Sequence, residues 1–482
     1  MVHINCSKNM FKIITTNDIA ALKMILPNGV FTSNEQLLKY SHDETEDISI
    51  LPNLVLKPET PEEISSILIY CNEHSIPVTP SGARTGLSGG AIPIHGGVAL
   101  SMEKFNKILT IDENNLQVTT EPGVITQVLQ EAVKEKGLFY PPDPASKGSC
   151  FIGGNISENS GGPKAVKYGV VKDYVLNLEV VLPNGEIIWT GSNVLKNATG
   201  YNITQLIVGS EGTLGIVTKI VLRLIPHPKF DLLMLAPFNS LEKASEAVSA
   251  IFRAGITPSA MELMEIDAIT LASKILDSTA IPLTENLAAH LIIEVDGNNM
   301  DVLMSEMEAI SEVLSQFDAG ELFFADDAQQ KNELWKIRRK ANEAAVMAGY
   351  TIEEDTVVPR AELPKLIKGV KELGAQNGFK VVCYGHAGDG NLHIRINHPT
   401  IKKSYGSDEM NAILKKLFEL VKELGGTISG EHGIGLIQKS YMPVLFNEVS
   451  LELMRGIKNT FDPNHILNSG KFLIIKSKRN RL

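Results

Sequence analysis

Three glycine-rich segments in the first half of the chain constrain its fold more than any other feature of the sequence. They span residues 81–90, 141–162 and 209–217. Glycine adopts positive φ and lets the backbone approach a ligand closely, and successive N–H groups in such turns can bind phosphate. None of the three is a GxGxxG loop of the NAD-binding type or a GxxxxGK(S/T) phosphate loop. Any one loop is explained equally well by ordinary tight turns, but the three together favour a dinucleotide site on a different fold.

The chain is long enough for two or three domains, because 482 residues exceed one ordinary hydrophobic core. Its composition changes after Pro226-His-Pro228, which predicts a domain boundary near residue 227. Strands are expected at 54–56, 77–79, 98–100, 117–120, 176–182, 186–189, 215–224, 291–295 and 380–384, and helices at 61–74, 240–254, 300–317, 329–348, 362–377 and 408–424. We therefore predict an α+β protein with a helical lead-in (1–45), a first domain (46–227), a second domain (228–471) and a basic tail (472–482).

Charge and cysteine content exclude several classes of partner. The net charge is −11, and a nucleic-acid partner is not expected because it normally requires a basic face. The four cysteines are scattered, which argues against a disulfide framework and a protein-bound iron–sulfur cluster. No signal peptide and no run of about 18 apolar residues is found. These features predict a cytoplasmic protein, and the basic tail leaves a peripheral position at the inner face of the membrane as an alternative.

The segment 381–397 carries two histidines in a pattern that predicts a β-hairpin with its turn at Asp389-Gly-Asn391. His386 ends the first strand and His393 opens the second, so pairing of the strands brings them close together. Strand alternation predicts a polar face with His393, Arg395 and Asn397 and a buried face with Leu392, Ile394 and Ile396.

Glu431 and His432 lie in a further glycine-rich stretch, 424–435. Two imidazoles and one carboxylate suit Zn²⁺, with Mn²⁺ and Fe²⁺ as alternatives, and leave a coordination position open for a substrate. A single histidine is more often just a hydrogen-bonded residue. The set His386, His393 and Glu431, in its glycine-rich context, nevertheless favours a divalent metal site.

Taken together, the glycine-rich segments resemble the FAD-binding domain of the vanillyl-alcohol oxidase/p-cresol methylhydroxylase superfamily. Within it, the chain is most similar to the branch of the glycolate oxidase D subunit, D-lactate dehydrogenase and D-2-hydroxyglutarate dehydrogenase. The similarity runs from about Leu54 to Lys471, and the GHxGDGNxH and GEHG patterns of that branch are both intact. The resemblance implies a PCMH-type FAD-binding fold for 46–227 and an α+β substrate-capping domain after it.

The resemblance also implies how FAD is held. Loop 81–90 would bind the pyrophosphate, the central segment the flavin, and 209–217 the adenosine end. The arginine that many relatives carry earlier in the first loop is displaced to Arg84, and Ser469 replaces a usual proline. Loop 81–90 has no histidine, so non-covalent FAD is expected. The implied FAD contacts are Ser81, Gly82, Ala83, Arg84, Thr85, Gly86, Ser88, Pro142, Asp143, Ser146, Gly153, Gly154, Asn155, Asn159, Gly161, Glu211, Gly212, Ile216 and Asn468.

The same resemblance assigns roles in catalysis. His386, His393 and Glu431 would be metal ligands, and His432 the base that removes the substrate hydroxyl proton as hydride passes to flavin N5. Arg338 matches the W-x-x-R pattern and would bind the substrate carboxylate, with a solvated basic helix face as the alternative. Asn342 would share its helix face, and Arg395 would read the far end of the substrate, which favours a second polar or acidic group there.

The expected reaction is oxidation of a D-2-hydroxy acid to the 2-keto acid, with D-lactate or glycolate as first choice. D-2-hydroxyglutarate, or a role as the catalytic D subunit of a glycolate oxidase, is the alternative. Electrons would leave to a separate quinone, cytochrome, flavoprotein or iron–sulfur subunit, and a homodimer is one option for the assembly. Two rivals stay open: a metal-free transferase or sugar oxidase on this fold, and a non-catalytic flavin-binding subunit.

Overall fold

The computed structural model describes residues 11–45, 48–278, 280–281, 283, 286–325, 327–401 and 407–474. The first ten residues of the predicted lead-in and most of the predicted basic tail, 475–482, lie outside the described residues. Among the described residues, no helix combines the length and the apolar composition that crossing a bilayer requires.

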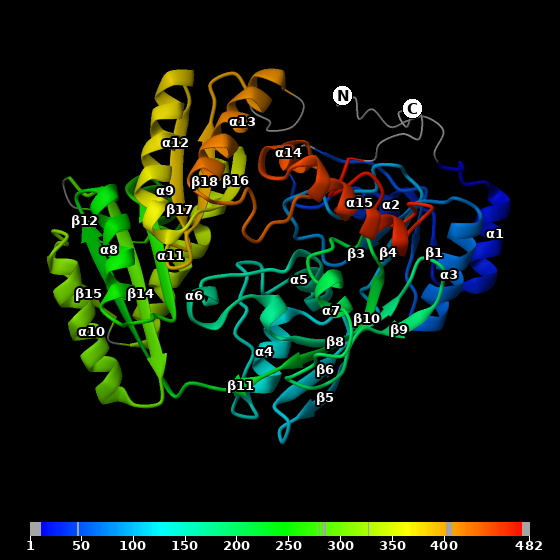
Figure 1. Ribbon diagram of the computed structural model, residues 1–482, viewed down its shortest axis with the longest axis horizontal. Coiled ribbons are helices and arrows are strands. Elements are labelled where there is room, and N and C mark those ends of the chain that lie inside the picture. The colour runs from blue at the N-terminus through cyan, green and yellow to red at the C-terminus, as the bar shows by residue number, and fades with distance from the viewer. Residues whose placement is uncertain are drawn as a thin grey trace.

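The first domain contains two larger β-sheets (Figure 1), and a short two-stranded sheet pairs β7 (Leu138–Phe139) with β11 (Ile225–Pro226). The mixed four-stranded sheet has the order β1 (Val30–Phe31), β2 (Leu54–Leu56), β4 (Val98–Ser101) and β3 (Val78–Ser81). The antiparallel five-stranded sheet has the order β5 (Ile108–Asp112), β6 (Gln117–Thr120), β10 (Ile216–Arg223), β8 (Val175–Val181) and β9 (Ile187–Trp189). These strands confirm the predicted ones to within two residues at each end and add β1 and β5.

Helix α3 (Pro61–Glu73) shows how the sequence fixes these elements locally. Thr60 caps the helix and forms a reciprocal capping box with Glu63, and Pro61 occupies the first turn. Its apolar side chains at helical spacing pack on the four-stranded sheet. The lead-in contains the expected helices, α1 (Thr16–Ile25) and α2 (Asn34–Lys39), but β1 between them pairs with β2, so this segment is part of the first sheet.

The second domain is built on a seven-stranded antiparallel sheet. Its order is β15 (Phe323–Phe324), β12 (Phe230–Phe238), β14 (Ala289–Gly297), β13 (Ala260–Glu265), β17 (Lys380–Gly385), β18 (Asn391–Asn397) and β16 (Ile352–Val357). One face packs on α8 (Leu241–Arg253), α10 (Met300–Ser315), α12 (Leu363–Asn377) and α13 (Asp408–Glu423), and the other on α9 (Ile266–Leu276) and α11 (Ala328–Met347). The five helices predicted here are confirmed, whereas α9 was missed because 260–276 has an apolar pattern that suits helix and strand alike.

The predicted hairpin of β17 and β18 is confirmed, with Tyr384 opposite His393. Leu392, Ile394 and Ile396 pack into the core beneath α12, as strand alternation predicts. His393 and Arg395 lie on the opposite face, but they are only 5% and 2% exposed. The polar face is therefore buried as well, and its ionisable side chains must find partners inside the protein.

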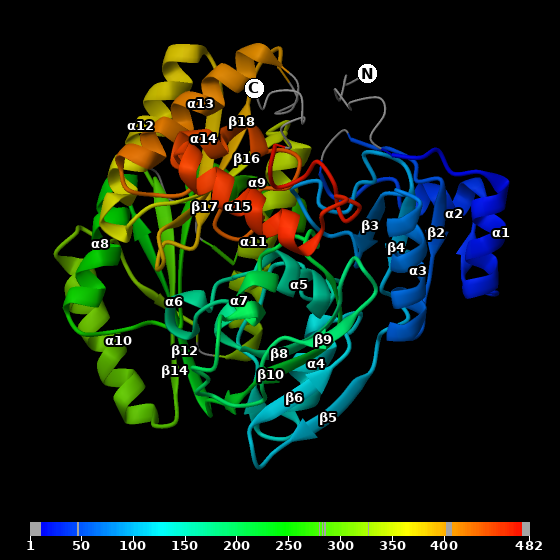
Figure 2. The same cartoon turned by 45° about the vertical axis from the view of Figure 1, so that its right-hand side comes forward.

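The C-terminal segment leaves the second domain and returns to the first (Figures 1 and 2). Helix α15 (Glu448–Phe461) packs Phe461 against the core of the five-stranded sheet. The backbone N–H of Val78 then donates to the carbonyl of Ile466 at 2.8 Å, and that of Asn468 donates to the carbonyl of Val78 at 2.9 Å. Ile466 and Leu467 are fully buried in the core of the four-stranded sheet. Residues after 462 thus complete the core of the first domain.

This packing predicts that Leu467→Ala lowers the free energy of unfolding by about 2–5 kcal/mol, because it leaves a cavity in that core. The matched control is Leu453→Ala on the exposed face of α15, where the same truncation should change stability by less than about 0.5 kcal/mol. Urea titration followed by far-ultraviolet circular dichroism measures both. Equal effects of the two substitutions would contradict the assigned packing of the C-terminal segment.

Candidate active site

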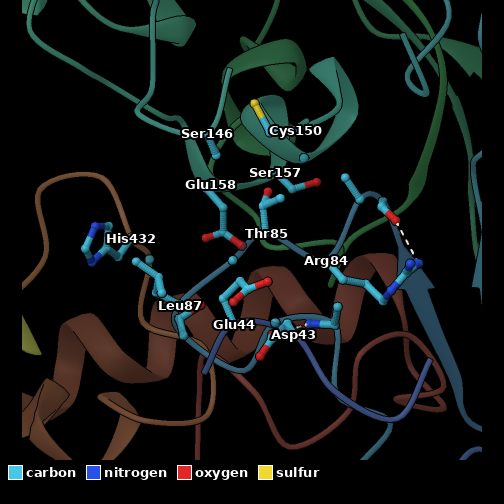
Figure 3. Close-up of a pocket in the computed structure, with 18 of the residues that line it drawn as sticks. Asp43, Glu44, Arg84, Thr85, Leu87, Ser146, Cys150, Ser157, Glu158 and His432 are labelled. Atoms are coloured by element: carbon cyan, nitrogen blue, oxygen red, sulfur yellow. Dashed lines mark hydrogen bonds between the residues drawn. The ribbon is translucent and has the colours of Figure 1, made fainter. Parts of the chain in front are cut away.

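A cavity of about 770 Å³ lies between the glycine-rich loops of the first domain and the polar face of the second-domain sheet. Its size is that of a cofactor and small-molecule site. In Figure 3, His432 and Arg84 lie on opposite sides of this pocket, and Glu158 and Thr85 lie between them. The predicted FAD contacts that line the cavity are Ser81, Gly82, Ala83, Arg84, Thr85, Gly86, Ser88, Ser146, Gly153, Gly154, Asn155, Glu211, Gly212, Ile216 and Asn468.

The lining of the cavity fits a polar dinucleotide. At Gly86 and Gly154, no atom of the described chain lies within 4 Å of an added Cβ, so the backbone opens directly onto space. The buried oxygens Ser81 Oγ, Ser88 Oγ and Glu158 Oε2 have no hydrogen-bond partner among the described residues. Buried polar atoms normally have partners, so these three indicate a ligand with polar groups, as FAD has.

The other predicted FAD contacts, Pro142, Asp143, Asn159 and Gly161, do not line the cavity. They belong to the loops and the helix end around it. The Pro142 carbonyl accepts from Gln130 Nε2 at 2.9 Å, and Asp143 Oδ1 accepts from the Lys164 N–H at 3.3 Å. Asn159 ends helix α5 (Ile152–Glu158) with a left-handed φ of 55°. Gly161 lies next to the candidate metal site, since a Cβ there would be 3.2 Å from Glu431 Oε2.

The three candidate metal ligands come together in the structure. One ligand atom from each of His386, His393 and Glu431 lies within 4.8 Å of the other two. Glu431 Oε1 is 3.3 Å from His386 Nε2 and 3.6 Å from His393 Nε2. Burial lowers the pKa of His393 to about 4, so its imidazole is neutral, which is the form that binds a metal. Two imidazoles and a carboxylate in this arrangement fit a divalent cation with one position left open.

A second set of residues, Glu353, His393 and His432, meets the same distance criterion and shares His393 with the first. We favour the first set because of the groups behind it. His386 Nδ1 is 2.8 Å from Glu262 Oε1, and a carboxylate in that position orients a metal-binding imidazole. Glu353 instead pairs with Arg395 through Oε2 at 2.6 Å, and this ion pair within the protein competes with the binding of a cation.

Glu262 is a site residue that the sequence analysis missed. It is fully buried on β13, and its Oε2 lies 2.7 Å from Nη2 of Arg338 as well as near His386. Burial opposes ionisation, but the charges of His386 and Arg338 outweigh it and hold the pKa of Glu262 below its usual value. Glutamates among the apolar residues of β13, Glu262 and Glu265, were the available signal, because a buried carboxylate needs a partner.

Arg338 is only 7% exposed, so the alternative of a solvated basic helix face is wrong. Its guanidinium lies over the Tyr384 ring, 5.3 Å from the centroid, and is not among the groups that line the cavity. Nε and Nη2 of Arg338 form no hydrogen bond of acceptable geometry within the described chain, although Nη2 is at ion-pair distance from Glu262. The side chain therefore keeps donors for a further anion.

Asp355 holds the loop that carries Glu431 and His432, and it too was missed. Its Oδ2 accepts the backbone N–H groups of residues 430, 431 and 432 at 2.9, 2.8 and 2.9 Å. Its Oδ1 accepts from Asn391 Nδ2 at 2.7 Å, which ties the same carboxylate to the turn between the two histidines. The signal was the acidic run Glu353-Glu354-Asp355 within a strand, where burial requires charge partners.

His432, Asn342 and Arg395 line the cavity together. The His432 ring stacks on that of His393 with 5.3 Å between centroids and 24° between planes. Asn342 Oδ1 accepts from Tyr384 Oη at 3.0 Å and from Arg395. The predicted base thus lies beside the candidate metal ligands, and the predicted substrate residues Asn342 and Arg395 lie at the same end of the cavity.

Glu211 links the first domain to the loop of the second. Its carboxylate accepts the backbone N–H groups of Ile434 at 2.8 Å and Gly435 at 2.7 Å. Asn468 Nδ2 donates to the carbonyls of Gly90 and Glu211 at 3.0 and 2.8 Å, so the C-terminal segment also holds the first glycine-rich loop. Glu211 and Asn468 line the cavity, but their polar groups are engaged mainly with the backbone around it.

Comparison with protein families agrees with this architecture. Residues 52–191 match the model of an FAD binding domain, and residues 227–472 match that of the C-terminal domain of FAD linked oxidases. Among solved structures, p-cresol methylhydroxylase with bound substrate matches with a TM-score of 0.76 at 18% identity, over 95% of this chain and 97% of that one. Alkyldihydroxyacetonephosphate synthase matches with a TM-score of 0.72 at 18% identity, over 98% and 86%. At such low identity, these two structures establish the fold alone, and they confirm the PCMH-type prediction.

Curated relatives are similar over nearly their whole length. The glycolate oxidase protein GlcD of Bacillus subtilis is 40% identical over 461 residues, which cover 95% of this chain and 96% of that protein. D-lactate dehydrogenase of Anaerostipes hadrus is 37% identical, with 96% and 99% covered, and D-2-hydroxyglutarate dehydrogenase of Stutzerimonas stutzeri is 30% identical, with 93% and 97% covered. The chain therefore belongs to the FAD-linked oxidase family, as an oxidoreductase of the branch that includes GlcD of glycolate oxidase, D-lactate dehydrogenase and D-2-hydroxyglutarate dehydrogenase.

Proposed function

We propose that this enzyme oxidises a small D-2-hydroxy acid, D-lactate or glycolate, to the corresponding 2-keto acid, using non-covalent FAD and a divalent cation. One observation carries the proposal: His386, His393 and Glu431 converge beside His432 at the end of the cavity that the glycine-rich loops line. Zn²⁺ is the first choice of cation for this ligand set, with Mn²⁺ and Fe²⁺ as alternatives. The names of the relatives support the class of substrate.

When bound, FAD would supply the hydride acceptor and the cation would lower the pKa of the substrate hydroxyl. The chain supplies the rest of the chemistry. His432 receives the hydroxyl proton on its imidazole, whose position is fixed by the backbone bond from its own N–H to Asp355. Arg338 does not line the cavity but lies next to the candidate metal ligand His386, with which it shares Glu262, and the donors that it retains would bind the substrate carboxylate there, for which a planar guanidinium is well suited. A carboxylate and a hydroxyl held at two fixed points leave C2–H of only one enantiomer directed at the flavin.

The electrons must then pass to a separate acceptor. The described cysteines are buried and apart in the fold: Cys71 lies on α3, Cys150 in the loop before α5 and Cys383 on β17, which does not suit a cluster site within this part of the chain. One relative is named as a subunit of glycolate oxidase. A partner subunit, a quinone, a cytochrome or another flavoprotein is therefore proposed as the acceptor.

Anaerobic reduction of the bound flavin tests the proposed reaction directly. D-lactate or glycolate should bleach the visible flavin absorption within a single turnover, and L-lactate should not, because only one enantiomer directs its hydrogen at the flavin. A stopped-flow spectrophotometer records the rates for a panel of D and L acids. If D- and L-lactate bleach the flavin equally fast, the stereochemical assignment is wrong; if no hydroxy acid bleaches it, the proposed function is wrong.

Loss of the metal site should abolish activity without removing the flavin. His393→Ala removes one of three ligands, so the metal content measured by plasma mass spectrometry and the rate of flavin reduction should both fall by about tenfold or more. The flavin absorption should stay at the wild-type level. Wild-type enzyme stripped with a chelator serves as control and should recover activity when Zn²⁺ or Mn²⁺ is added. Full activity without any metal would favour the metal-free oxidase or transferase alternative.

Replacement of the base separates proton removal from binding. His432→Asn should lower the rate of flavin reduction by about 10²- to 10⁴-fold, because the hydroxyl proton then has no acceptor. The metal and flavin contents should remain unchanged. The control His74→Asn alters a histidine outside the cavity, which contacts Tyr70, and should leave the rate unchanged. A rate within twofold of wild type for His432→Asn would contradict the assigned role.

A further inference from the structure

Arg395 lies two residues after His393 on β18 and lines the same cavity as His432. An arginine in this place would bind a second carboxylate at the far end of a dicarboxylic substrate, provided that no other anion already occupied it. The immediate surroundings of Arg395 therefore bear directly on the class of substrate that the site accepts.

Glu353 is the anion that already pairs with Arg395. Glu353 and Arg395 are cross-strand partners on β16 and β18, and Arg395 Nη2 lies 2.6 Å from Glu353 Oε2. Their side chains are only 10% and 3% exposed, so solvent screens the pair little. Arg395 also donates to Asn342 Oδ1 and, through Nη1, to the Tyr350 carbonyl at 3.4 Å. The guanidinium thus already has an anion and two further acceptors within the protein.

The carboxylate of Glu353 would also repel a second carboxylate on the substrate. Its Oε1 lies 3.8 Å from His393 Nδ1, so the negative charge faces the position beside the candidate metal ligands. Asp355, fully buried, adds another carboxylate 3.9 Å from the same nitrogen. In a buried site of low dielectric constant, bringing a like charge into contact is costly, and such contacts exclude unwanted partners.

Arg338 differs from Arg395 in the partners of its guanidinium group. Its carboxylate partner, Glu262, is shared with His386, and apart from the ion pair between Nη2 and Glu262 neither Nε nor Nη2 of Arg338 has a hydrogen-bond partner among the described residues. The site therefore has an arginine with donors left for one carboxylate, whereas the charge of Arg395 is matched within the protein.

We propose that Glu353 is a specificity-determining residue that restricts the enzyme to short monocarboxylic 2-hydroxy acids and rejects dicarboxylic ones such as D-2-hydroxyglutarate. The inference rests on the proposed function and deepens it, because it selects among the substrates that the family leaves open. It also replaces the expectation that Arg395 reads a second acidic group.

Steady-state kinetics with an artificial electron acceptor test this proposal. The wild-type holoenzyme should have a kcat/KM for D-lactate at least about 100-fold higher than for D-2-hydroxyglutarate. Glu353→Gln removes the negative charge and keeps the size of the side chain, so the ratio should narrow by about tenfold or more, mainly through a lower KM for the dicarboxylate. The control Glu333→Gln, on the exposed face of α11, should leave the ratio unchanged.

The outcomes distinguish this inference from the proposed function. Comparable kcat/KM values for both acids in the wild type, or an unchanged ratio in a folded Glu353→Gln variant, would overturn the inference and leave the proposed function standing. Inactivity of the wild type with every hydroxy acid would overturn both.

Product inhibition provides a test that needs no variant. Pyruvate should inhibit D-lactate oxidation competitively at concentrations at least about tenfold lower than 2-oxoglutarate does, because only the latter carries the second carboxylate. Equal inhibition by the two keto acids would count against Glu353 as the determinant.

Discussion

The buried carboxylate of Asp355 is the interaction on which the candidate active site depends. It gathers three successive backbone N–H groups of the loop that carries Glu431 and His432, and it also holds the side chain of Asn391 in the turn between the two histidines. A carboxylate that accepts several N–H bonds stays ionised even when it is buried. One side chain on β16 thereby fixes the relative positions of the candidate base and the candidate metal ligands, which come from distant parts of the sequence.

Neither domain forms the cavity alone. The glycine-rich loops of the first domain provide space and polar groups for a dinucleotide, and the second-domain sheet provides ionisable side chains. Glu211 connects the two by accepting the backbone N–H groups of Ile434 and Gly435, just after His432. The C-terminal segment then enters the core of the first sheet through Ile466 and Leu467. The loop with the candidate base is therefore held from both sides, which suits a site where small displacements of the reacting groups would slow the reaction.

The polar face of the second-domain sheet shows how charge is distributed in a buried site. The two arginines next to this face each pair with one glutamate. Glu262 lies beside Arg338 of α11, and Glu353 lies beside Arg395 of β18. The two pairs differ in their additional contacts. Glu262 is shared between Arg338 and His386, whereas Arg395 also donates to Asn342 and to the Tyr350 carbonyl. In the proposed mechanism, local pairing of this kind, more than the number of arginines, would decide which anions the site accepts.

Much of this protein was determined by its sequence alone. The change of composition after Pro226-His-Pro228, the hairpin turn at Asp389-Gly-Asn391 and the periodicity of the helices predicted a two-domain α+β fold, because turns and alternation are local properties. The residue types of His386, His393 and Glu431 predicted a metal site, and the resemblance to the family added His432. Only the tertiary structure revealed Glu262, Glu353 and Asp355 and showed that the face with His393 is buried. Those roles depend on which strands become neighbours across the sheet and on what covers them, and no local pattern in the chain encodes that pairing.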